Sequence, residues 1–178
     1  VEIADTSGIA LLFDDIIETD ENDTNKGLLR DRAVKTLGEG EWEFEYKYLD
    51  LVDTENGNAW VSANKTVTVY WPRPENAPEN AEFTLLHFNG LHREMGTHEI
   101  AANVAGCTVT EVELTLSEDG EYLCFEVDST GFSPFVLAWS APDDPDHPYI
   151  PPVTPTEPSE PDYTPNWLNT TDHFGYII

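Results

Sequence analysis

Three histidines that lie close together in the sequence could hold a metal ion. His87, His92 and His98 fall within twelve residues, and imidazole nitrogens are common zinc ligands. Their spacings of five and six residues, however, place no pair on one face of a helix, and no nearby cysteine completes a ligand set. We therefore assign neither a metal site nor a cofactor.

An acidic segment at residues 18–25 (ETDENDTN) resembles a calcium loop in part. Asp20, Asn22 and Thr24 have the alternating spacing of the first oxygen ligands. A calcium loop also needs glycine at its sixth position and glutamate at its twelfth, where this sequence has Asn25 and Asp31. A solvated turn is the favoured interpretation of this segment.

The familiar patterns of catalytic residues are missing from the sequence. No serine lies in a G-x-S-x-G elbow, and no phosphate-binding loop is present. Acidic pairs such as Asp14-Asp15 and Asp143-Asp144 cannot be assigned to a glycosidase, because the chain has 35 acidic residues. We assign no catalytic residue and predict that the protein is not an enzyme.

An aromatic row in residues 41–52 has two interpretations. Its aromatic side chains alternate with charged ones, which indicates a half-buried strand with Trp42, Phe44, Tyr46 and Tyr48 on one face. Such a row could stack against sugar rings, or it could belong to the core. The charges on the opposite face favour the core.

Charge limits the partners of this chain of 178 residues. With 35 acidic and 8 basic residues, its net charge is -27. It lacks the basic stripe that phosphate groups require, so we expect neither nucleic acid nor anionic membrane as a partner. No apolar run approaches transmembrane length. The opening residues do not resemble a signal peptide, and we expect the chain to be a fragment of a longer protein.

The stretch at residues 108–140 predicts the closing strands of a β-sandwich. Two alternating strands flank the turn at residues 117–120, and residues 134–140 form a further apolar run. Pairing residue 116 with 121 places Leu114 opposite Leu123 and Val112 opposite Phe125. The same register separates Cys107 from Cys124 beyond disulfide reach, so both are expected to be free thiols.

Other segments complete a mostly β pattern. Further strands are expected near residues 59–62, 65–71 and 82–88, and a strand is favoured over a helix at residues 8–17. Residues 26–37 predict a helix that Asn25 caps and Gly38 ends, and a helical turn is expected at residues 97–104. The predicted core consists of Trp42, Phe44, Tyr46, Val69, Trp71, Leu114, Leu123, Phe125, Leu137 and Trp139.

The chain becomes rich in proline after the predicted sandwich. Nine of its thirteen prolines lie in residues 142–165. This density favours an extended polyproline spacer and opposes a packed core.

The residues that follow resemble the opening of an S-layer homology module. Six positions match its pattern L-N-x-x-D-H-x-x-Y-I: Leu168, Asn169, Asp172, His173, Tyr176 and Ile177. Residues 48–72 and 131–139 also resemble repeat-bearing surface proteins of clostridial-type Gram-positive bacteria. The resemblance implies a secreted, wall-attached protein. S-layer homology modules bind cell-wall polysaccharide, usually as a set of three, but their ligand-binding part is absent here, so no binding residue is transferred.

These observations predict three parts. Residues 1–140 are expected to form an immunoglobulin-like β-sandwich with one or two short helices, residues 141–166 a Pro-rich linker, and residues 167–178 the truncated start of an S-layer-like module. The expected function is that of a non-catalytic extracellular module, acting as stalk, scaffold or adhesin. One alternative is a module that binds a host glycan or protein, including immunoglobulin, which an exposed aromatic patch would favour. The other is an accessory domain of a surface hydrolase.

Overall fold

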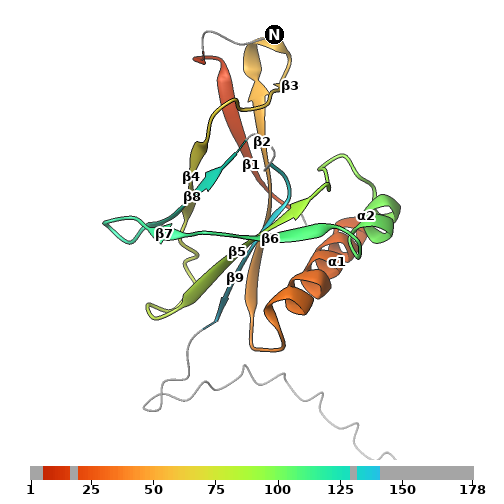
Figure 1. Ribbon diagram of the computed structural model, residues 1–178, viewed down its shortest axis with the longest axis vertical. Helices are drawn as coiled ribbons and strands as arrows, with labels where there is room; N and C mark the ends of the chain where they lie inside the picture. Colours follow the sequence, from red (N-terminus) through yellow and green to blue (C-terminus); the bar gives the residue numbers. More distant parts are fainter. Residues whose placement is uncertain (1–5, 17–19, 129–131, 141–178) are drawn as a thin grey trace, which may run out of the picture. The chain divides into compact units, whose positions relative to one another are not determined.

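The computed structural model describes the chain at residues 6–16, 20–128 and 132–140. The predicted linker at 141–166 and the predicted module start at 167–178 lie outside the described residues. Within them, the chain forms two antiparallel β-sheets and two α-helices (Figure 1).

The larger sheet has five main strands, whose order in the sheet differs from their order in the sequence, and one additional short strand. Its path runs β1 (Ile9–Asp15), β2 (Glu43–Asp53), β9 (Phe135–Ser140), β5 (Glu82–Asn89) and β6 (Thr108–Val112), and β3 (Ala59–Trp60) pairs with β2. The smaller sheet runs β4 (Val67–Pro72), β8 (Tyr122–Val127) and β7 (Thr115–Leu116). The helices are α1 (Asp20–Leu37) and α2 (Thr97–Asn103), and a 3-10 turn covers Thr54–Asn56.

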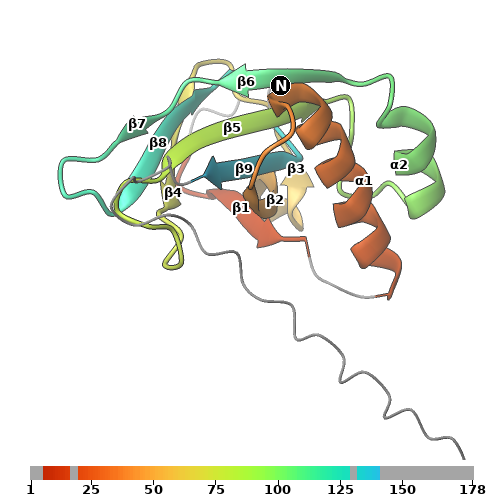
Figure 2. The ribbon, with the colours of Figure 1, turned by 90° about the horizontal axis from the view of Figure 1, so that it is seen from below.

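These elements form three layers. Figure 2 shows both helices on one face of the larger sheet and the smaller sheet on its other face. The structure thus confirms a mostly β fold in which two antiparallel sheets pack face to face. It adds a helical layer, so the larger sheet is covered on both faces.

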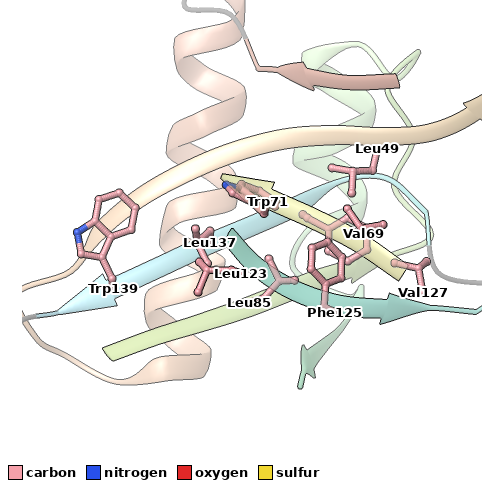
Figure 3. Close-up of a cluster of buried hydrophobic side chains, with 10 residues drawn as sticks. Leu49, Val69, Trp71, Leu85, Leu123, Phe125, Val127, Leu137 and Trp139 are labelled. Carbon is pink, nitrogen blue, oxygen red and sulfur yellow. The ribbon is translucent and has the colours of Figure 1, made fainter. Parts of the chain in front are cut away.

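Each face of the larger sheet has its own hydrophobic core. Between the sheets lie ten buried side chains, nine of them labelled in Figure 3, including Trp71, Phe125 and Leu137. On the other face, Leu29 of α1 and Ile100 of α2 pack against Leu86 and other strand residues. A strand buried on both faces must be apolar at every position, and all five residues of β9 from Phe135 to Trp139 are buried.

The hairpin at residues 115–127 has a different register from the predicted one. Leu116 pairs with Leu123, and Thr115 with Cys124, so the register is shifted by two residues. The loop is closed by a hydrogen bond from the N–H of Ser117 to the carbonyl of Tyr122. A shift of two keeps each side chain on its face, and Leu123 and Phe125 are buried as predicted.

The predicted strand at residues 108–116 is divided between the two sheets. Val112, in β6, pairs with Leu85 of the larger sheet rather than with Phe125. Only β7 joins the smaller sheet, after the chain has passed through Glu113 and Leu114. The alternation of side chains continues through this passage, and alternation alone does not show that a strand changes partners.

The described part of the acidic segment, residues 20–25, is helical rather than the expected turn, because α1 begins at Asp20. Asn25 therefore lies inside the helix rather than at its cap. It is buried together with Leu29 and Ala33, which follow at intervals of four residues and so share its face. The predicted end is confirmed: Gly38 has a φ of +94°, and its N–H donates to the carbonyl of Val34.

The aromatic row of β2 packs under α1. Phe44, Tyr46 and Tyr48 are half-buried against the helix-side core, and the side-chain cations of Lys26 and Arg30 lie over the rings of Tyr46 and Phe44. The favoured interpretation as a core row is therefore confirmed for these three residues. Burial of the Tyr46 hydroxyl raises its pKa to about 12.

Six members of the predicted core are buried and four are only half-buried. The buried ones are Val69, Trp71, Leu123, Phe125, Leu137 and Trp139; the half-buried ones are Trp42, Phe44, Tyr46 and Leu114. Trp42 lies just before β2, where its indole N–H donates to the carbonyl of Gly38.

Candidate ligand-binding pocket

A polar pocket of about 650 Å³ lies where β1, α1 and the loop before α2 meet. Strand β1 supplies Asp14 and Asp15 at its end, α1 supplies Asn25, and the loop supplies Arg93. Apolar atoms also contribute to the wall, from Phe13, Ile16, Tyr48 and Met95.

Arg93 joins three parts of this pocket. Its Nη1 donates to Asp14 at 2.6 Å, and its Nε donates to Asp50 at 2.5 Å. Its Nη2 donates to the carbonyl of Tyr48 at 3.3 Å, and the guanidinium lies 5.6 Å from the centre of the Tyr48 ring. Because Asp14 belongs to β1 and Asp50 to β2, one side chain fixes both strands to the loop.

Burial acts on the pKa values of both Asp50 and Arg93. Burial raises the pKa of Asp50, and the hydrogen bond and charge of Arg93 oppose that shift. Burial also acts to lower the pKa of Arg93, but its bonds to Asp14 and Asp50 outweigh this and the pKa is raised. The guanidinium thus stays charged, and Asp50 depends on it as a counter-charge, since an unpaired buried carboxylate is costly.

Asn25 is the unusual member of the pocket. It is only 4% exposed, and its Oδ1 has no hydrogen-bond partner among the described residues. A buried acceptor without a donor costs about 1–3 kcal/mol, and such a group in a folded protein calls for an explanation. Sequence reasoning treated Asn25 as a helix cap; the available signal was its spacing of four residues from Leu29, which places an amide on an apolar stripe.

The three histidines considered for a metal are in different environments. His87 is buried, stacks on Phe135 at 4.5 Å between ring centres, and donates from Nε2 to the carbonyl of Phe132. Burial lowers the pKa of His87. His92 and His98 are exposed, and the ring of His92 lies 6.5 Å from that of Trp60. Within the described ranges, no group of three His, Cys, Asp or Glu residues is arranged to hold a metal ion.

Exposed aromatic side chains occur at two other places. Trp60, 47% exposed, lines a groove of about 920 Å³ together with Ile9, Leu51 and Lys65, among others. On the outer face of the smaller sheet, the rings of Tyr70 and Tyr122 meet edge to face at 6.2 Å. Both tyrosines are exposed, so they are not needed to fill the core.

Both cysteines are free, as predicted. Cys124 lies opposite Thr115, not Glu113 as the predicted register implied. The thiol of Cys107 donates to the carbonyl of Val104 at 3.1 Å, and burial raises its pKa.

Comparison with known proteins gives no family assignment. No protein-family model, curated protein or solved structure matches this chain. Neither helix in the described part of the chain is long and apolar enough to cross a membrane.

Proposed function

We propose that the protein is a non-catalytic extracellular module of a bacterial cell-surface protein, acting as stalk, scaffold or adhesin beside a wall anchor. The observation that carries this proposal is the order of parts along the chain. A β-rich domain with two covered sheet faces is followed by a segment with nine prolines and then by the S-layer-like motif at residues 168–177. A folded unit, a spacer and an anchor in this order suit a protein displayed away from the wall.

We further propose that the domain is immunoglobulin-like. The support is that two antiparallel sheets pack face to face around an aromatic core of Trp71, Phe125 and Trp139. The helical layer on the larger sheet would be an addition to that type of sandwich.

The expected partner is cell-wall polysaccharide, bound by S-layer homology modules downstream of the described domain. Nucleic acid is a poor alternative because of the net charge of -27. Several of the few basic side chains are also engaged within the protein: Lys47 pairs with Asp15, Arg93 with Asp14 and Asp50, and Arg73 donates to the carbonyl of Pro78.

Sedimentation with purified cell walls from the source organism tests this proposal. The full-length product of the gene is expected to sediment with the walls, and a version that ends at residue 166 is expected to stay in the supernatant. The Asp172→Ala, His173→Ala double variant of the full-length product tests the motif itself and is expected to bind more weakly. Equal sedimentation of the full-length and shortened proteins, or none of either, would refute the wall-anchor proposal.

A ligand-binding module for a host glycan or protein is the second candidate, and the exposed aromatic side chains favour it. Trp60 in its groove and the Tyr70–Tyr122 pair present ring surface to solvent, and rings of this kind are common in recognition sites. Binding to a panel of glycans and host proteins should then be lost in Trp60→Ala or in Tyr70→Ala. The accessory role beside a hydrolase stays a prediction.

A further inference from the structure

The pocket around Asn25 and Arg93 offers more hydrogen-bond acceptors than the protein uses. Arg93 contacts Oδ2 of Asp14 and Lys47 contacts Oδ1 of Asp15, which leaves the other oxygen of each carboxylate without a described donor. These side chains are 54% and 75% exposed. The Oδ1 of Asn25 also lacks a donor. A ligand for this pocket must therefore bring donors.

Charge decides which kind of donor is preferred. Asp14, Asp15 and Asp50 carry three negative charges near the pocket, against the positive charges of Lys47 and Arg93. The group thus keeps one excess negative charge, within a chain whose net charge is -27. The field at such a site attracts cations and repels anions.

The apolar wall suits the carbon stem of such a ligand. Tyr48 and Met95 line the same pocket as Asp14 and pack on the helix-covered face of the larger sheet. The ring of Tyr48 already has the guanidinium of Arg93 at 5.6 Å from its centre. Aromatic faces attract cations, so these walls are compatible with a further ammonium group nearby.

We propose that this pocket binds a protonated primary amine, whose ammonium group donates to Asn25 Oδ1 and Asp14 while its methylene chain contacts Tyr48 and Met95. The ammonium can come from a lysine side chain of a partner protein or from a free polyamine. This inference does not depend on the wall-anchor proposal, because it uses neither the linker nor the S-layer-like motif.

Calorimetric titration of the full chain tests the ligand class. The probes are Nα-acetyl-lysine methylamide, spermidine, and Nα-acetyl-norleucine methylamide as a neutral control that lacks the ammonium group. Both amines should bind and the norleucine compound should not; the tighter of the two amines identifies the source of the ammonium group. Failure of both amines to bind would overturn the proposal, as would equal binding of norleucine. Tighter binding of a neutral sugar such as N-acetylglucosamine would also overturn it.

Three variants test the location. Asn25→Leu removes the acceptor without leaving a buried polar atom, and Asp14→Asn removes one charge. Each should weaken amine binding about tenfold, the effect of losing one hydrogen bond to a charged group. Glu126→Gln, on β8 of the smaller sheet, removes the same charge far from the pocket lining and should leave affinity unchanged. If Glu126→Gln and Asp14→Asn weaken binding equally, the attraction is diffuse and the proposed site is wrong.

Discussion

The indole N–H of Trp71 donates to the carboxylate of Glu45 at 2.8 Å. Trp71 lies in β4 of the smaller sheet and Glu45 in β2 of the larger one, so this bond joins the two sheets. The charged face of β2 is thus used in packing: beside Glu45, Lys47 lies over the ring of Phe13 and within 5.7 Å of the Trp71 ring centre.

Removing this carboxylate should weaken the contact between the sheets. We expect Glu45→Ala to lower the free energy of unfolding by about 1–3 kcal/mol, because the buried indole N–H of Trp71 loses its acceptor. Urea denaturation measures the change. Glu43→Ala is the matched control, since Glu43 is exposed on the same strand and should change stability by less than about 0.5 kcal/mol. Equal effects would show that the Glu45–Trp71 bond contributes nothing specific.

Phe125 should be the most sensitive position of β8. Its ring is buried between the sheets and lies 5.6 Å from Phe135 and 6.4 Å from Trp71. Phe125→Ala should cost about 3–5 kcal/mol of stability, as is usual for a buried aromatic residue. Tyr122→Ala, at an exposed position of the same strand, should cost less than about 1 kcal/mol. A reversed order in urea denaturation would mean that the faces of the hairpin are reversed.

Much of the fold can be predicted from the sequence because its strands alternate and its turns have clear signals. The strand at 43–53, the helix end at Gly38 and the burial of Leu123 follow from periodicity and glycine. The register of the hairpin is harder to predict. The loop closes at Ser117 and Tyr122 instead of at residues 116 and 121, which changes every cross-strand pair but leaves each side chain on the same face of the sheet. The division of 108–116 between two sheets leaves no trace in local alternation.

The candidate pocket could not be predicted for a different reason. Arg93 meets Asp50 and Asp14 across separations of 43 and 79 residues, and only the order of strands in the larger sheet brings them together. In a chain with 35 acidic residues, no local pattern distinguishes these two aspartates. For Asn25, the spacing of four residues from Leu29 is a usable signal only if the helix extends back to Asp20.

The two cysteines should titrate as free thiols. Reaction of the denatured, unreduced protein with a chromogenic disulfide should detect two groups per chain, because both are free in the structure. In the native protein Cys107 should react more slowly than after unfolding, since burial raises its pKa and the thiolate is the reactive form. Cys107→Ser should remove this slow reaction. Detection of no thiol in the denatured protein would contradict the structure.

His87 should make stability depend on pH below neutrality. Burial lowers its pKa from the ordinary value of 6.5, so as pH falls below that value the unfolded chain takes up a proton before the folded protein does. The free energy of unfolding therefore loses the His87 contribution as pH falls toward the folded pKa, by at most about 1.4 kcal/mol per pH unit. Well above pH 6.5, where neither state binds a proton at His87, this residue contributes no pH dependence.

A comparison with His87→Phe isolates this effect from the many carboxylates. Urea denaturation at several values between pH 5 and pH 8 gives the stability of both proteins. As pH falls, the free energy of unfolding of the wild type should decrease relative to that of the variant. A difference that is constant across this range would show that His87 has the same pKa in the folded and unfolded states.

The central claim is that this acidic domain is displayed outside the cell. Treatment of intact cells of the source organism with a membrane-impermeant, amine-reactive biotin reagent tests it most directly, because Lys35 and Lys65 are exposed. A cytoplasmic enzyme detected in the same cells is the control for lysis. We predict that the protein is labelled on intact cells while the control is not. Labelling of this protein only after the cells are broken would contradict the account.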